Sequence, residues 1–444
     1  MTTSWAGYLC LAIFVLGYTF VILEEKIHLR KSKPVIVAGC LMWLLIGLLE
    51  RGQADGHAHE FVVELVAEIG ELFFFLLAAM TYINTLAERN VFNALRTWLL
   101  GRGMGFRKLF WTTGVIAFFL SPLADNLTTA LLLSTVALAV SGGNSRFIVM
   151  SFTNIVVAAN AGGAWSPFGD ITTLMVWTAG KVETLTFSYL MIPSLVTWLI
   201  PALCMYPFLP NEQPQVAKET VHLKPGAKTI IVLGVCTIAT AVSFHQFLHL
   251  PPFMGMMLGL GVLMIFGFLL KRQGHGSGLD NLPMPGGMTQ ETIQKEDSSF
   301  DIFKSVETVE FDTLLFFFGV LTAVGALQYL GYLALVSEGL YGTIGPTWSN
   351  ITVGVLSAIL DNIPIMYAVL KMDPAMSMDQ WLLITLTCGV GGSLLSIGSA
   401  AGVAAMGVDR KNYTFMEHLK WSWAIALGYA GGIVSWWFVT MPLR

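Results

Sequence analysis

Two pairs of polar residues interrupt long apolar stretches of the sequence. They are Asp125-Asn126 and Asp361-Asn362, and each lies near the middle of its stretch. A carboxylate in apolar surroundings is strongly disfavoured unless it faces a cavity or a partner. Asp and Asn are also good N-caps of helices. Each pair therefore predicts either a simple helix cap or part of an ion-binding site, and we favour the ion-binding site.

Asp170 follows a run of residues that break helices. Such residues favour an unwound backbone whose carbonyl groups can point at a cation. Asp170 would add an anionic oxygen, and Thr172 and Thr173 would add hydroxyl oxygens. Oxygen ligands of this kind suit hard cations such as Na⁺ or Li⁺. A helix cap at the edge of a vestibule is the alternative for Asp170. The helix-breaking residues are Gly162, Gly163, Pro167 and Gly169.

A matching glycine-rich stretch in the second half of the chain, residues 389–402, carries no acid. We expect Ala400 at the position of Asp170, so the predicted site is asymmetric. Asn160, beside the glycines of the first stretch, is a further expected ligand. For Na⁺ itself we expect Asp125, Asp170 and Thr173. Serines that could contribute from the second stretch are Ser393, Ser396 and Ser399.

Such a carboxylate cluster is chemically sufficient for cation/proton exchange. Protons and metal ions compete for the same buried carboxylates, so each expels the other. If the site moves only when it is occupied, this competition produces antiport.

Other titratable residues could carry protons or sense pH. Glu64, Glu68 and Glu71 have the spacing of one helix face, whereas His57 and His59 lie in a predicted outer loop. For both groups an ordinary solvated surface is the alternative interpretation.

Composition places these residues in a membrane. The 444-residue chain is 55% hydrophobic and only 12% charged, against about 25% charged residues in soluble domains. Its apolar blocks have the length of about 20 residues that a helix needs to cross a bilayer. We therefore predict an all-α polytopic membrane protein and no enzyme. Expected spans are residues 5–24, 34–49, 62–87, 146–179, 186–208, 228–247, 252–270, 311–336, 380–408 and 415–440.

The two interrupted stretches, residues 109–140 and 343–370, are predicted to be re-entrant hairpins. If both enter and leave on one side, almost all Lys and Arg residues fall on the inner side, as the positive-inside rule requires. Residues 91–108 are expected to form an amphipathic surface helix. Residues 272–310, rich in glycine, proline and charge, are expected to be a cytoplasmic linker.

The order helix, hairpin, broken helix, helix occurs twice. Since the first copy starts outside and the second inside, the fold class is one of inverted-topology repeats with two re-entrant hairpins and two broken transmembrane helices. The expected organisation is N-terminal helices (1–60), repeat 1 (61–210), connecting helices with the linker (211–310) and repeat 2 (311–444).

Three motifs resemble those of the NhaD-type sodium/proton antiporters, which belong to the ion transporter superfamily. The motifs are Ser-Pro-x-x-Asp-Asn-x-Thr-Thr, Asn-x-Gly-Gly-x-Trp-Ser-Pro-x-Gly-Asp-x-Thr-Thr and Asp-Asn-x-Pro. The resemblance covers the chain from about residue 60 onward. It implies Na⁺(Li⁺)/H⁺ exchange, a homodimer in the bacterial inner membrane and an elevator-like movement. It implies no cofactor beyond the transported ions. Ion-pathway residues implied by these motifs are Asp125, Asn126, Asn160, Asp170, Thr172, Thr173, Asp361 and Asn362.

The main alternative is a sodium-coupled dicarboxylate or other organic anion symporter of the same superfamily. Asp125 and Asp361 at the hairpin tips would repel such an anion. An arsenite-type permease is a further alternative. No nucleic-acid partner is expected; the expected partners are Na⁺, Li⁺, H⁺ and the lipid bilayer.

Overall fold

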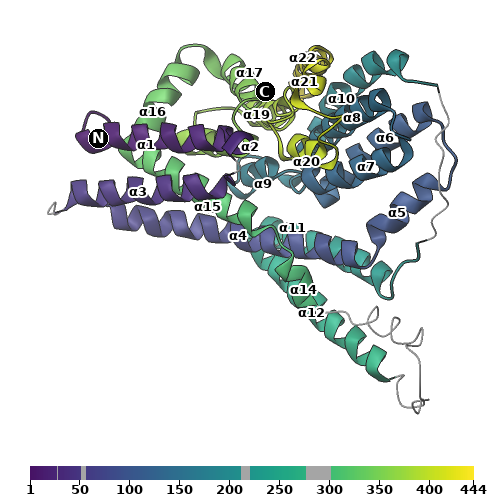
Figure 1. The fold of residues 1–444 in the computed structure, drawn as a ribbon. Helices are drawn as coiled ribbons and strands as arrows, with labels where there is room; N and C mark the ends of the chain where they lie inside the picture. The colour runs from purple at the N-terminus through teal and green to yellow at the C-terminus, as the bar shows by residue number, and fades with distance from the viewer. Residues whose placement is uncertain (28, 52–56, 212–220, 277–301) are drawn as a thin grey trace. The chain divides into compact units, whose positions relative to one another are not determined.

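The chain folds into helices throughout the part that the computed structural model describes (Figure 1). No strand occurs there, so the prediction of an all-α protein is confirmed. Most of the predicted linker 272–310 lies outside the described residues. The structure describes residues 1–27, 29–51, 57–211, 221–276 and 302–444.

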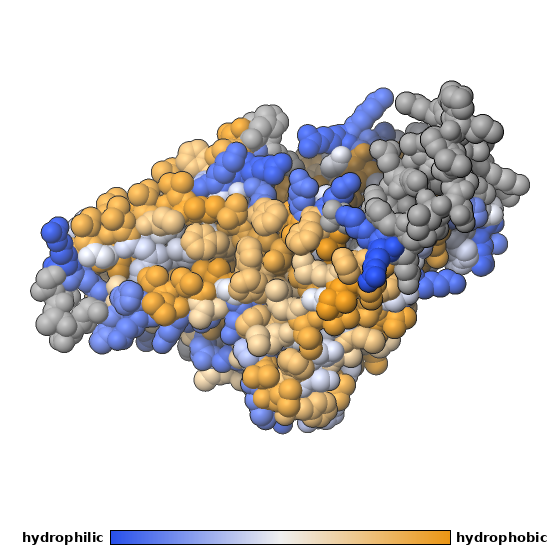
Figure 2. All heavy atoms as spheres, turned by 90° about the horizontal axis from the view of Figure 1, so that it is seen from below, coloured by the Kyte–Doolittle hydropathy of each residue, from blue (hydrophilic) through white to orange (hydrophobic). Residues whose placement is uncertain are grey.

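Eight helical segments among the described residues are long and apolar enough to cross a membrane. Each coincides with a predicted span, which confirms a multi-pass membrane protein. Figure 2 shows apolar side chains spread over much of one face, and residues such as Val232 and Ile265 are more than half exposed, as expected of surfaces that face lipid. The segments are α1 (Trp5–Ile22), α3 (Ser32–Glu50), α8 (Ser145–Ala164), Thr184–Phe208, α11 (Ala227–Leu248), Pro252–Arg272, α15 (Phe311–Leu330) and α22 (Ser422–Val439).

The other elements are shorter or more polar. Segment Thr184–Phe208 consists of η1 (Thr184–Leu190), α10 (Met191–Met205) and η2 (Tyr206–Phe208), and Pro252–Arg272 belongs to α12 (Pro252–Gly276). The expected surface helix is α5 (Val91–Leu100), which ends earlier than predicted. The remaining short or polar elements outside the hairpins and broken helices are α2 (Glu24–Ile27), α4 (Ala58–Glu88), α14 (Ile302–Glu307), α16 (Tyr332–Ser337), η3 (Glu338–Gly342), α21 (Phe415–Leu419) and η4 (Met441–Leu443).

Each interrupted stretch forms two helices with the Asp-Asn pair at their junction. In the first stretch α6 (Phe106–Ala124) and α7 (Asn126–Val140) meet at Asp125. In the second, α17 (Gly345–Leu356) and α18 (Asn362–Met372) are joined by residues 357–361. With 15 and 11 residues, α7 and α18 are shorter than the roughly 20 residues of a full span.

Each glycine-rich stretch forms a broken helix. The pairs are α8 with α9 (Ile171–Thr178), and α19 (Met378–Gly391) with α20 (Ala400–Val408). Both breaks are closed by a glycine pair whose backbones nearly touch, because a Cβ atom at Gly163 would lie 2.6 Å from the Gly169 carbonyl oxygen and one at Gly392 would lie 2.5 Å from the Gly398 carbonyl oxygen.

The structure corrects the expected equivalence of Asp170 and Ala400. Asp170 is the N-cap of α9, with backbone angles φ −149° and ψ 152°. The N-cap of α20 is Ser399, with φ −144° and ψ 150°. The sequence comparison was therefore one residue out of register, and the counterpart of Asp170 is a neutral side chain that also caps a helix.

The two hairpins contact the broken helices through the same bonds. Ser121 of α6 donates to the Ala159 carbonyl at 2.7 Å, and Ser357 donates to the Cys388 carbonyl at 3.0 Å. A Cβ atom at Gly162 would overlap the Phe118 carbonyl oxygen, and one at Gly391 would overlap the Gly354 carbonyl oxygen. Such repeated contacts are what two copies of one supersecondary unit produce.

The chain divides into two compact units. The larger unit comprises residues 1–65, 99–218 and 315–444 and holds both hairpins and both broken helices. The smaller unit comprises residues 66–98 and 219–314. In the smaller unit α11 and α12 approach closely, since a Cβ atom at Gly255 would lie 2.5 Å from the Ala241 Cα.

Candidate ion-binding site

Asp125, at the first hairpin tip, caps its own second arm. Its Oδ1 accepts a hydrogen bond from the Thr128 amide at 2.7 Å, and its Oδ2 accepts one from the Thr128 hydroxyl at 3.1 Å. Its backbone, at φ 55° and ψ 166°, occupies a region that costs a non-glycine residue about 1–3 kcal/mol. The Asp125 carboxylate therefore stabilises the tight turn between α6 and α7.

Asn126 starts a buried network of neutral side chains, which we call the neutral cluster (Asn126, Asn160, Ser393 and Ser399). The Asn126 amide donates to Asn160 Oδ1 at 3.1 Å. The Asn160 amide donates to Ser393 Oγ and Ser399 Oγ, both at 2.8 Å. Both amide protons of Asn160 are therefore used, and the cluster is closely packed and uncharged.

His418 of α21 contacts the neutral cluster through the backbone of Ser393. Its Nε2 lies 2.8 Å from the Ser393 carbonyl oxygen, and its Nδ1 lies 2.6 Å from the Tyr413 hydroxyl. Because a carbonyl can only accept, Nε2 carries the proton and Tyr413 donates to Nδ1. Burial lowers the pKa of His418 to about 4. The ring is therefore neutral at physiological pH. Its two hydrogen bonds fix the position of the Ser393 backbone, a structural role that the sequence analysis did not predict.

Asp170 and Asn362 form the second group of buried polar side chains, the acidic cluster (Asp170, Thr172 and Asn362). The Asn362 amide donates to Asp170 Oδ2 at 2.9 Å. Asp170 is 5% exposed and Thr172 is fully buried. The Thr172 hydroxyl is buried beside the Asp170 carboxylate and has no other hydrogen-bond partner. The second hairpin tip therefore meets the first broken helix at an unneutralised carboxylate.

Gly389 lies beside the acidic cluster, at the position in the repeat that corresponds to Asn160 of the neutral cluster. In the glycine-rich stretches Asn160 precedes Gly162-Gly163 by the same spacing as Gly389 precedes Gly391-Gly392. A Cβ atom at Gly389 would lie 3.7 Å from Asp170 Oδ2 and 3.9 Å from the Thr172 hydroxyl oxygen. The position that an amide fills in the neutral cluster thus carries no side chain beside the carboxylate.

Asp361, at the second hairpin tip, pairs with a cation from a distant segment. The Lys31 ammonium lies 2.7 Å from its Oδ2 and 4.3 Å from the centre of the Phe316 ring. The Asp361 side chain is 13% exposed, and its Oδ1 is buried without a hydrogen-bond partner. The sequence suggested only a cytoplasmic loop cation at Lys31, because a contact across 330 positions leaves no local signal.

The hydroxyl groups of two predicted site residues, Thr173 and Ser396, form hydrogen bonds outside the two clusters' side-chain networks. The Thr173 hydroxyl accepts from the Asp170 amide at 3.2 Å and donates to the Asp170 carbonyl at 2.6 Å, so it caps α9. Ser396 donates to the Met406 thioether sulfur at 3.2 Å.

The candidate proton-pathway residues lie on α4 and directly before it. His57 and Glu60 form an exposed pair at 3.3 Å, and His59 is exposed. On α4, Glu64 and Glu68 are exposed and Glu71 is half-buried. Their roles in a proton pathway stay predictions.

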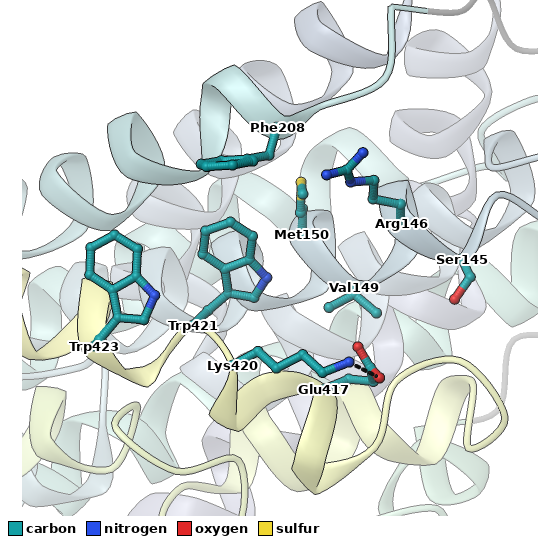
Figure 3. A pocket seen from close by; sticks show the side chains of 9 residues that line it. All are labelled: Ser145, Arg146, Val149, Met150, Phe208, Glu417, Lys420, Trp421 and Trp423. Atoms are coloured by element: carbon teal, nitrogen blue, oxygen red, sulfur yellow. Dashed lines mark hydrogen bonds and ion pairs between the residues drawn. The ribbon is translucent and has the colours of Figure 1, made fainter.

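A separate cavity of about 580 Å³ contains none of the predicted site residues (Figure 3). It is lined by residues of the first turns of α8, the end of η2, α21, the segment that joins α21 to α22, and the start of α22.

Comparison with known proteins identifies the family. A family model described as "Citrate transporter" matches residues 18–389. The Na(+)/H(+) antiporter NhaD of Vibrio cholerae is 51% identical over 437 residues, covering 98% of this chain and 92% of that protein. NhaD of Vibrio parahaemolyticus is 54% identical over 407 residues, covering 90% and 98%. Sodium/proton antiporter 1 of Arabidopsis thaliana is 32% identical over 439 residues, covering 96% and 71%.

A solved structure supports the fold. The YdaH transporter of Alcanivorax borkumensis aligns with a TM-score of 0.50 at 17% identity, covering 93% of this chain and 99% of that one. From the near-complete coverage and high identity of the sequence relatives, the chain belongs to the NhaD-type sodium/proton antiporter family of the ion transporter superfamily.

Proposed function

We propose that this protein exchanges Na⁺ for H⁺ and that the exchange occurs at the acidic cluster. The observation that carries the proposal is the buried Asp170 carboxylate, which has the buried Thr172 hydroxyl and a glycine in place of an amide beside it. A carboxylate and a hydroxyl oxygen are ligands that a hard monovalent cation accepts. Relatives that are 51% and 54% identical, over 98% and 90% of this chain, are named Na⁺/H⁺ antiporters.

Asn362 fits both occupants of such a site. In the structure its amide group donates to Asp170 Oδ2 at 2.9 Å. Rotation of the side-chain amide would instead present its carbonyl oxygen to a cation. A proton on Asp170 removes the negative charge that holds Na⁺, so one ion leaves as the other arrives.

Charge balance in the larger unit favours Asp170 over the two tip acids. Asp125 caps α7 through both oxygens, and Asp361 is neutralised by Lys31. No basic side chain among the described residues pairs with Asp170. The Lys31 ammonium also offsets the repulsion that a nearby Asp361 carboxylate exerts on a second negative charge. Asp170 is thus the acid whose charge a transported cation would balance.

The paired hairpins and broken helices support alternating access. We propose that repeat 1 (61–210) and repeat 2 (311–444) have opposite membrane orientations, that both hairpins are re-entrant, and that the clusters move together in an elevator-like step. The support is the duplicated set of contacts, with Ser121 and Ser357 in equivalent bonds. Li⁺ as a second cation and a homodimer in the bacterial inner membrane belong to the same proposal.

An organic anion symporter fits the site less well. The citrate-transporter family model covers most of the chain, but an anionic substrate at the acidic cluster would face the unneutralised Asp170 carboxylate. Like charges at close range in a poorly hydrated site repel strongly.

Purified protein in proteoliposomes tests the proposal. A sodium gradient should drive a pH change inside the vesicles, and Asp170→Asn should reduce this flux by about 100-fold, since a charged partner of a buried ion contributes about 1.5–3 kcal/mol. Glu183→Gln is the matched control, because Glu183 is an exposed acid of the same unit. Unchanged flux in Asp170→Asn, or sodium-driven citrate uptake by the wild type, would contradict the proposal.

A further inference from the structure

The cavity of Figure 3 lies at the ends of three apolar helical segments, namely α8, Thr184–Phe208 and α22. Ser145 and Arg146 stand in the first turn of α8, Phe208 closes the segment that contains α10, and Trp421 precedes α22. Segments Thr184–Phe208 and Ser422–Val439 are long enough to span a bilayer. The cavity is therefore at the level where a span passes from hydrocarbon to the headgroup region.

The cavity carries more positive than negative charge. Its charged residues are Arg146, Glu417 and Lys420. Lys420 pairs with Glu417 at 2.5 Å, whereas Arg146 is exposed and no ion pair with it occurs among the described residues. The first turn of α8 adds the positive end of its helix dipole. One guanidinium is thus available to an anion, with a lysine ammonium on the facing wall (Figure 3).

Aromatic rings form the other side of the cavity. Phe208 and Trp421 meet edge to face with their centres 5.6 Å apart, and Trp421 stacks with Trp423 at 6.4 Å. Trp423 is 53% exposed. Tryptophan is enriched at membrane interfaces because its ring is apolar while its N–H is polar. The combination of basic groups and indole rings is typical of an interfacial site.

Exposed apolar side chains occur on α10 and α22, the two helices whose ends border the cavity. α10 and α22 pack together, since a Cβ atom at Gly428 would overlap the Thr197 carbonyl oxygen. On their outer sides Leu203 is 57% exposed and Leu427 is 52% exposed. A molecule whose head occupies the cavity can therefore place hydrocarbon chains against these helices.

We propose that this cavity binds the headgroup of an anionic phospholipid. The phosphate is held by Arg146 and Lys420, the glycerol region contacts Trp421 and Trp423, and the acyl chains follow α10 and α22. A soluble anion would use only the basic groups and would leave the rings and the apolar surface unoccupied. A lipid satisfies all three features, and basic pockets between spans recognise lipid headgroups in this way.

Native mass spectrometry of the purified full-length protein with phosphatidylglycerol or phosphatidylcholine tests the proposal. Phosphatidylglycerol should bind preferentially, and Arg146→Gln and Lys420→Gln should each weaken its binding about fivefold, because a basic residue near an anionic lipid contributes about 1 kcal/mol. Arg146→Lys should keep most of the binding, which separates loss of charge from loss of fold. Lys411→Gln removes an exposed charge outside the cavity and should change nothing.

Three results would overturn the lipid assignment. The first is equal binding of phosphatidylglycerol and phosphatidylcholine by the wild type. The second is unchanged phosphatidylglycerol binding in the double variant Arg146→Gln/Lys420→Gln. The third is displacement of the lipid by millimolar inorganic phosphate, which would indicate a simple anion site. None of these readouts depends on ion transport.

Discussion

The neutral and acidic clusters correspond to each other under the internal repeat, and each joins the tip asparagine of one repeat to the broken helix of the other, yet only the acidic cluster contains a carboxylate. In the neutral cluster Asn160 uses its amide protons on two serines and accepts from a tip asparagine. In the acidic cluster the same position is Gly389, and Asp170 replaces the capping Ser399. One of the two corresponding clusters is therefore filled by hydrogen-bonded neutral side chains, while the other keeps space beside a carboxylate.

The two hairpin tips also differ in the partners of their aspartates. Asp125 satisfies its own helix end through Thr128. Asp361 makes no cap bond and is paired with Lys31 instead. Identical Asp-Asn pairs thus have different local roles, and the chemistry of the site depends on which partners the rest of the chain brings to them.

Among substitutions that leave Asp170 itself in place, filling the space beside it should have the largest effect on Na⁺ binding. Gly389→Asn places an amide where the neutral cluster has Asn160, so we expect Na⁺ to bind about 100-fold more weakly as its direct contact with the carboxylate is lost. Gly389→Ala is the control, because its Cβ would make only ordinary contacts of 3.7–3.9 Å. Isothermal titration calorimetry in detergent measures both. Equal affinities in the two variants would show that the space is not used by the ion.

Removing Lys31 should destabilise the protein by about 2 kcal/mol, because Lys31→Gln leaves Asp361 as a largely buried, unpaired carboxylate. The double variant Lys31→Gln/Asp361→Asn should recover most of this loss. Lys33→Gln, two positions away and exposed, should stay within about 0.5 kcal/mol of the wild type. Chemical unfolding in micelles gives the comparison. Additive losses in the double variant would argue against the ion pair.

Substitutions of the adjacent threonines Thr172 and Thr173 should affect different properties, ion affinity at Thr172 and stability at Thr173. Thr172→Val removes a hydroxyl oxygen beside the Asp170 carboxylate, so Na⁺ affinity should fall about tenfold. Thr173→Val breaks the cap of α9 and should destabilise the protein by about 1 kcal/mol with little effect on affinity. Unfolding and calorimetry together measure both changes. Similar behaviour of the two variants would contradict the assignment of Thr172.

The smallest effect should come from His418, beside the neutral cluster. Its folded pKa of about 4 lies below the ordinary value of 6.5, so the unfolded chain binds more protons between these values and stability falls as pH drops. Between pH 6.5 and 5.5 this group should account for about 1 kcal/mol. His418→Gln should show a shallower pH dependence of unfolding. A slope identical to that of the wild type would mean that His418 is not buried in neutral form.

Sequence patterns predicted the local features of this site well. Helix breakers located both breaks, and polar pairs in apolar stretches located both junctions at Asp125 and Asp361. Asp170 stood out because its acidity is unusual among its apolar neighbours. These features depend on neighbouring residues, whose preferences are visible in a single sequence.

Long-range partners could not be predicted in the same way. Lys31 reaches Asp361 across 330 positions and His418 reaches Ser393 across 25, and such contacts depend on how the helices pack. The counterpart of Asp170 was missed by one residue, although aligning the glycine pairs at 162–163 and 391–392 would have given Ser399. The N-cap is set by backbone geometry at Gly169 and Gly398, which residue types alone do not specify.

Sodium binding by two neutralised variants tests the central claim most directly. Calorimetric titration at alkaline pH should show no measurable Na⁺ binding for Asp170→Asn. The double variant Lys31→Gln/Asp361→Asn, in which the other buried acid is neutralised together with its counter-ion, should bind Na⁺ within about threefold of the wild type. Retained binding in Asp170→Asn together with lost binding in the double variant would contradict the account and place the cation at Asp361.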